Sequence, residues 1–172
     1  MEWRQLIIDS YERISQELER ALEGLALDDL NQQPSPDSNS MGWLVWHLTR
    51  GQDRAIAAIT GEDQLWVKDG WHGKFNRPPD PQDSGFRHSP ADLATFKSPD
   101  VPALLAYHYA VLERTKHCIS NLTETDLDRD LDHPKYPTVG ARLVGNISDN
   151  LQHVGQIAYV HGLLKGRGWL DA

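Results

Sequence analysis

Asp149 and His153 form the residue pair, near the C-terminus, that could do chemistry. Residues four positions apart on an α-helix lie one turn apart on the same face, so the carboxylate and the imidazole would be neighbours. Asn146 and Gln156 fall on that face too, beside an apolar stripe made of Leu143, Ile147, Leu151, Val154 and Ala158. A carboxylate and an imidazole next to a packing surface must be exposed, paired or bound to a ligand. A divalent metal ion is a ligand that suits them both.

His47 is the third candidate, because it interrupts the apolar face of another amphipathic helix, predicted over residues 40–60. If this helix faces the one that carries Asp149 and His153, two imidazoles and one carboxylate would meet inside a helical bundle. Such a set suits zinc or another late divalent ion and leaves a coordination position open for water or substrate. A metal with an open position can acidify a bound water or thiol, or polarise a carbonyl.

A simpler interpretation of each residue stays open. The spacing of Asp149 and His153 is also that of an i, i+4 ion pair, which is favoured on spacing alone. His47 could equally be a core or surface histidine whose hydrogen bonds are satisfied. The metal site is favoured because two unusual positions occur on helices that should face each other.

Other reactive residue types give weaker signals. His108 and Cys118 share one apolar stripe and are expected in the core, although His108 could line the site opposite the metal. Arg50 and Arg54 follow His47 by about one and two turns and could hold a carboxylate, but an arginine on a helix is mostly solvated. The remaining histidines are expected at the surface: His72, His88, His117, His133 and His161.

Four long helices would position these residues. Apolar spacing predicts them over about residues 2–24, 40–60, 98–122 and 138–166, with Ser40, Ser98 and Thr138 as N-caps. Short helical turns are expected around residues 27–30 and 124–127. The segment 61–97 should be irregular, and its aromatic residues predict that it packs down and covers something: Trp66, Trp71, Phe75, Phe86 and Phe96.

This order of elements predicts an all-α fold, a four-helix bundle in a single domain over residues 1–172. The short connections, between the first and second helices and between the third and fourth, suit antiparallel neighbours. The long connection between the second and third helices suits a crossover. An up-down-down-up order is therefore expected.

Composition limits the class of protein. The chain has 172 residues, 39% hydrophobic and 24% charged, which is typical of a globular domain. Its formal net charge of -8 and the absence of a basic run argue against a nucleic-acid partner. No stretch is apolar enough to be a signal peptide or to span a membrane, and one cysteine cannot form an intrachain disulfide. We expect a cytoplasmic protein.

Two stretches carry a family resemblance. They are residues 41–50, which contain Trp-His-Leu-Thr-Arg around His47, and residues 149–157, which contain His-Val-Gly-Gln-Ile from His153 onward. With these motifs the chain resembles the DinB/YfiT-like metalloenzyme superfamily, and within it the branch of mycothiol-dependent maleylpyruvate isomerase. The resemblance covers nearly the whole chain and implies that His47, Asp149 and His153 bind the metal. Many members have histidine at the position of Asp149, and the isomerase branch has the longer Glu.

The resemblance also implies a cytosolic bundle, often a homodimer, that binds zinc or nickel and uses a low-molecular-weight thiol as cosubstrate. We therefore expect a metal-dependent thiol S-transferase or isomerase that acts on a small-molecule substrate, with no nucleic-acid or membrane partner. Two alternatives stay open. One is a metal-dependent hydrolase, for which His108 is a weak candidate base. The other is a non-catalytic, stress-related bundle with a vestigial metal site.

Overall fold

The computed structural model describes residues 2–166, and this part of the chain is all-helical, as predicted. Each of the four long helices begins and ends within three residues of its predicted bounds. The long helices are α1 (Trp3–Leu22), α3 (Met41–Thr60), α7 (Val101–Asn121) and α8 (Val139–Lys165). The short ones are α2 (Leu27–Asn31), α4 (Leu65–Lys68), α5 (Trp71–Lys74), α6 (Pro90–Thr95) and the 3-10 helix η1 (Thr125–Asp128).

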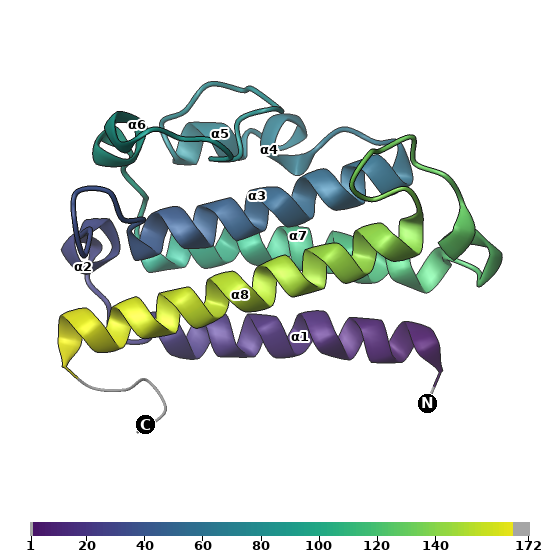
Figure 1. Cartoon of the computed structure of the whole chain (residues 1–172), viewed down its shortest axis with the longest axis horizontal. Coiled ribbons are helices and arrows are strands. Elements are labelled where there is room, and N and C mark those ends of the chain that lie inside the picture. The colour runs from purple at the N-terminus through teal and green to yellow at the C-terminus, as the bar shows by residue number, and fades with distance from the viewer. Residues whose placement is uncertain (1, 167–172) are drawn as a thin grey trace.

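The long helices pack against one another through their apolar stripes. Both α7 and α8 contact α1 and α3, so each long helix has two long neighbours. Figure 1 shows α3 and α7 running in one direction and α1 and α8 in the other. The interior is filled by buried apolar side chains from all four, among them Leu18, Leu48, Val111 and Ile157. None of the helices in the described range is long and apolar enough to cross a membrane.

Side-chain caps fix where the long helices begin. Ser40 and Thr138 cap α3 and α8 as predicted, and each accepts the N–H of the residue three positions along. The prediction that Ser98 caps the third long helix is wrong, because Asp100 does so, accepting an N–H at 3.0 Å. The backbone N–H of Ser98 instead donates to Asn31 Oδ1 on α2 at 2.9 Å. Ser98, which the local sequence predicted as the N-cap, thus makes a tertiary contact with α2 instead.

The segment between α3 and α7 lies along α3, with α4, α5 and α6 forming a layer over it (Figure 1). Trp66, Phe75 and Phe96 are buried, which confirms that the segment packs down onto the long helices. The segment contains three short helices, which the prediction of an irregular region missed. Phe86 is different, because 73% of its surface stays exposed.

Candidate metal centre

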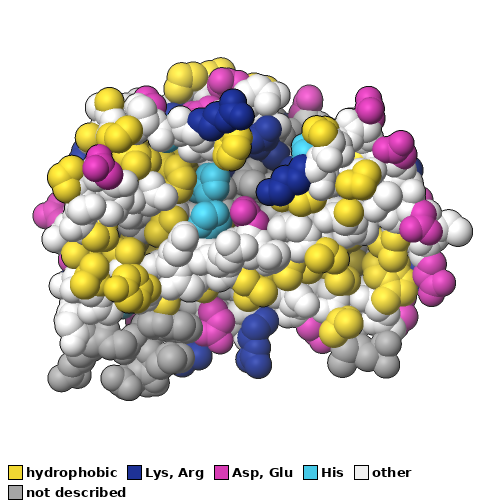
Figure 2. Space-filling model, in the orientation of Figure 1, with side chains coloured by type: hydrophobic (Ala, Val, Ile, Leu, Met, Phe, Trp, Pro, Cys, Tyr) yellow, Lys and Arg dark blue, Asp and Glu magenta, His cyan; other side chains and the backbone are white. Residues whose placement is uncertain are grey.

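The three predicted ligands meet where α3 and α8 pack together. His47 comes from α3, and Asp149 and His153 lie one turn apart on α8. One ligand atom from each lies within 4.8 Å of the other two, the one such cluster of His, Cys, Asp and Glu among residues 2–166. The imidazoles meet edge to face, with ring centroids 4.8 Å apart. Figure 2 shows histidine side chains beside an acidic one in a hollow, with basic side chains nearby.

Each imidazole already uses its Nδ1 atom. His47 Nδ1 bonds to the backbone carbonyl oxygen of Ser84, and His153 Nδ1 lies 2.7 Å from Gln156 Oε1. Because a carbonyl oxygen only accepts, Nδ1 carries the proton in both rings. The Nε2 lone pairs are therefore left for a ligand, which is how metal-binding histidines are commonly oriented.

The ring of His47 is held in place and kept neutral. Trp43, one turn earlier on α3, stacks on it with ring centroids 4.7 Å apart and an interplanar angle of 11°. Burial lowers the pKa of His47; the bond to the Ser84 carbonyl opposes this shift, and the neighbouring His153 adds to it. Only neutral imidazole binds a metal, so this environment favours the ligating form.

The ion pair that spacing alone favoured is present in a loose form, without a hydrogen bond. His153 Nε2 and Asp149 Oδ1 are 3.7 Å apart, which is beyond hydrogen-bond distance. Two atoms that share an ion at about 2.1 Å are at most about 4.2 Å apart. The cluster would therefore have to contract by at least roughly half an ångström at its widest to hold a divalent ion, and by more for tetrahedral coordination. Two imidazole Nε2 atoms and a carboxylate oxygen are a donor set that fits such an ion.

One face of α3 holds residues 81–88 against the candidate ligands. It comprises Trp43, His47, Arg50 and Arg54, spaced by three or four positions. Trp43 donates to His88 Nδ1 at 3.1 Å, and the two arginines donate to acceptors in this segment at 2.8–3.3 Å. The segment therefore fixes the orientation of His47 from outside the helix. Arg50, expected to be mostly solvated, is instead fully buried, where it donates to backbone carbonyls and pairs with the carboxylate of Asp53.

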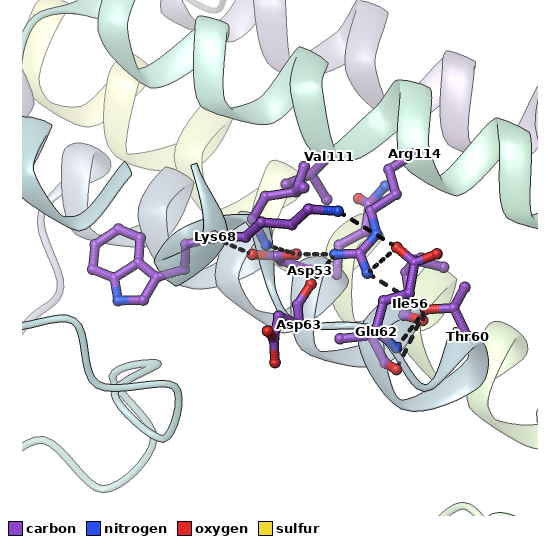
Figure 3. Close-up of polar contacts among 12 residues, drawn as sticks. Asp53, Ile56, Thr60, Glu62, Asp63, Lys68, Val111 and Arg114 are labelled. Carbon is purple, nitrogen blue, oxygen red and sulfur yellow. Dashed lines mark hydrogen bonds and ion pairs between the residues drawn. The ribbon is translucent and has the colours of Figure 1, made fainter. Parts of the chain in front are cut away.

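A buried carboxylate, that of Asp53, fixes the beginning of α4. Asp53 accepts the first two N–H groups of α4 at 3.0 and 2.9 Å and the hydroxyl of Tyr107 at 2.9 Å. It also pairs with Arg114 at 3.3 Å and with Arg50 at 3.5 Å. Figure 3 shows Arg114 reaching from α7 to Asp53 and to the turn that follows α3. A buried charge is stable only when paired in this way, so α3, α4 and α7 are fixed together.

A cavity of about 330 Å³ opens beside the candidate ligands, and His47 and Asp149 form part of its wall. The segment 81–88 contributes Ser84 and Phe86 to the lining. The loop before α8 contributes His133, Lys135 and Tyr136, and α3 and α8 contribute Gly51, Arg54, Arg142, Gly145 and Asn146. Space for a small molecule therefore adjoins the three ligand atoms.

Sequence reasoning missed most of this lining. Ser84, Lys135, Tyr136 and Arg142 lie in loops or on a helix face that carries no local signal of a site. His133 is exposed as expected, yet it lines the cavity, and His117 is exposed as well. The prediction that the other three histidines lie at the surface is wrong, because all three are half-buried: His72, His88 and His161.

His108 and Cys118 lie in the core of the long helices. His108 Nδ1 is 3.5 Å from Thr49 Oγ1, and burial lowers the pKa of this histidine to about 4. His108 does not line the cavity, so the expected base of a hydrolase is not placed there. Burial raises the pKa of the Cys118 thiol, which suits a packed side chain and not a nucleophile.

Known proteins place the chain in a family. A solved crystal structure of a conserved protein from Enterococcus faecalis is similar to it, with a TM-score of 0.87 and 29% sequence identity. The match covers 97% of this chain and 99% of that one. No curated protein shows a significant match. The sequence model of the DinB superfamily matches residues 10–157, a range that contains all three candidate ligands. The chain belongs to the DinB superfamily.

Proposed function

We propose that the chain is a divalent-metal-dependent enzyme that uses a low-molecular-weight thiol in an S-transferase or isomerase reaction. It would act on a small molecule in the cytoplasm, on an up-down-down-up four-helix bundle. The observation that carries the proposal is the convergence of His47, Asp149 and His153 beside a cavity whose wall includes the first two. Zinc or nickel suits two imidazoles and one carboxylate. The motifs shared with the mycothiol-dependent isomerase branch support the thiol.

The chain's own residues prepare the site by setting the proton positions of the imidazoles, the plane of the His47 ring and the space beside the ligands. The Ser84 carbonyl and the Gln156 side chain hold the proton on Nδ1 of each imidazole, so both Nε2 atoms stay available. Trp43 fixes the plane of the His47 ring. A bound ion with an open coordination position would lower the pKa of a thiol and supply a thiolate nucleophile. The cavity offers room for that thiol and its acceptor.

Metal content tests the site directly. Protein purified without a histidine tag should carry close to one zinc or nickel ion per chain by mass spectrometry of the metal. His47→Ala and His153→Ala should lose most of it, whereas His117→Ala, an exposed histidine on α7, should keep it. A chelator should lower the Tm of the wild type and of this control. If the wild type binds no stoichiometric metal and His47→Ala changes neither metal content nor Tm, the metal site is refuted.

A thiol panel tests the reaction class. Metal-loaded protein is incubated with mycothiol, bacillithiol or glutathione and an electrophile such as monochlorobimane. One thiol should form conjugate well above background, and His47→Ala should abolish the gain. Bound metal without conjugation of any thiol would refute the thiol chemistry while leaving the metal site standing. Among residues 2–166, no contact favours the hydrolase over this reaction, since His108 lies in the core.

A further inference from the structure

The cavity beside the candidate ligands is basic, although the chain as a whole has a net charge of -8. Arg54 from α3, Lys135 from the loop before α8 and Arg142 from α8 all line it, and Asp149 is the acidic residue of the lining. Figure 2 shows basic side chains gathered around the hollow that holds histidine and acidic side chains. A bound divalent ion would make the cavity more positive still.

Arg142 is half-buried, and one of its donor atoms lacks an acceptor within residues 2–166. Its Nε is buried without a hydrogen-bond acceptor among the described residues. Its guanidinium lies over the ring of Tyr136, 4.9 Å from the centroid, which is a contact with no formal counter-charge. Burial lowers the pKa of Arg142, so the charged form is held at a cost. A buried donor without an acceptor is rare in folded proteins and points to a missing partner.

Arg54 also has no carboxylate partner within the described chain. It donates to Ser84 Oγ at 2.8 Å and to Gln82 Oε1 at 3.3 Å, and both acceptors are neutral. Burial lowers the pKa of Arg54, and the positive charges of Arg50 and Arg142 lower it further. Two guanidinium groups that repel each other therefore face one cavity, where Asp149 is the single carboxylate among the described residues of the lining.

Glycines keep this cavity open on both helices. Gly51 follows His47 by one turn on α3, and a Cβ there would lie 3.6 Å from Asp149 Oδ2. Gly145 precedes Asp149 by one turn on α8, and a Cβ there would overlap the ring of Tyr136. The volume of about 330 Å³ is at the small end of ligand sites in proteins.

We propose that this cavity binds the carboxylate of a small anionic substrate, with Arg54 and Arg142 as its direct partners and Lys135 adding positive charge. The planar fork of a guanidinium matches a carboxylate with two parallel hydrogen bonds. The inference rests on the proposed function for the reacting end of that molecule, which would lie against His47 and Asp149. The carboxylate could belong to the thiol or to its acceptor, and both would make the same contacts.

Binding of a thiol-free acid tests the anion site by itself. Metal-loaded protein is titrated calorimetrically with succinate and with its neutral diamide, succinamide. Succinate should bind at least about tenfold more tightly, as expected for charge-assisted hydrogen bonds. Arg54→Gln and Arg142→Gln should each remove most of this preference, and Arg54→Lys should restore part of it. Arg13→Gln, an exposed arginine on α1, is the matched control and should change nothing.

Three results would overturn the inference. These are equal binding of succinate and succinamide, an unchanged preference in the Arg54→Gln/Arg142→Gln double variant, and tighter binding of inorganic phosphate than of succinate. Metal content and Tm of each variant show whether it has folded. A glutamine variant that has lost its metal and has a lowered Tm is replaced by the lysine variant at the same position. That lysine variant must retain the preference for succinate.

Thiol-bearing probes separate this inference from the proposed function. A preference for 3-mercaptopropionate over 3-mercaptopropionamide would place the carboxylate on the thiol, and a preference confined to succinate would place it on the acceptor. Arginine-dependent binding of succinate without any thiol conjugation would support the anion site and refute the thiol reaction. Conjugation could instead be equally fast with acidic and neutral thiols and acceptors, while succinate binds no more tightly than succinamide. That result would support the thiol reaction and refute the anion site.

Discussion

His108 should make the protein less stable as the pH falls from 7.5 to 5.0. Its side chain is buried on α7, and its Nδ1 lies 3.5 Å from Thr49 Oγ1. The Thr49 hydroxyl already donates to the carbonyl of Val45 at 2.9 Å, so Nδ1 of His108 must carry the proton. The other nitrogen, Nε2, is buried and has no hydrogen-bond partner in the part of the chain that the structure describes. Protonation there would create an unpaired charge in the core.

The size of the effect follows from the two pKa values. Burial lowers the pKa of His108 to about 4, whereas the unfolded chain keeps the ordinary value of 6.5. The unfolded state therefore binds the proton more tightly, and this loss of stability begins as the pH falls below 6.5 and is complete below 4. Proton linkage gives a decrease of about 2 kcal/mol in unfolding free energy between pH 7.5 and 5.0. The limiting decrease is about 3 kcal/mol.

Urea unfolding of metal-free protein at the two pH values measures this decrease. Other groups titrate in the same range, so the relevant quantity is the difference between the wild type and His108→Gln, whose side chain does not titrate. The wild type should lose about 2 kcal/mol more than the variant. Equal losses would mean that His108 titrates near its ordinary pKa in a solvated position, and the general-base role would then be open again.

Two further predictions concern the surroundings of the candidate ligands. Gln156→Leu removes the acceptor that orients His153 and should raise the metal Kd by about 10- to 100-fold in competition with a chelating dye; an unchanged Kd would show that the contact is dispensable. Gly51→Ala should raise the unfolding free energy by up to about 1 kcal/mol, since its Cβ meets only ordinary contacts. Gly145→Ala should lower it by about 1–3 kcal/mol, since its Cβ overlaps Tyr136; if urea unfolding gives both variants the same sign, the packing argument is wrong.

The long helices and the cluster of three ligands were predictable because both depend on local spacing. Apolar periodicity gave each long helix to within three residues, and a four-residue step put Asp149 and His153 on one face. His47 could be paired with them because helical order limits which helices face each other. The metal that these residues would hold stays a prediction.

The rest depends on contacts between distant parts of the chain. Arg50 and Arg54 are four positions apart and looked equivalent, yet Arg50 is buried against Asp53 while Arg54 reaches the cavity. What separates them is the path of residues 81–88, which no local pattern encodes. Lys135 and Arg142 likewise enter the site only through the fold of the loop before α8. The charge of the cavity was therefore not predictable from sequence alone.

The placement of the candidate ligands on α3 and α8 has a consequence for folding kinetics. His47 and Asp149 are about a hundred residues apart along the chain, so an ion held by both would act as a reversible cross-link between its two halves. The complete ligand set exists only after these helices have docked, so an ion that binds all three residues stabilises the docked state and not the states before it. The ion should therefore slow unfolding much more than it accelerates folding. Metal-bound protein would then unfold slowly because α8 detaches slowly from α3.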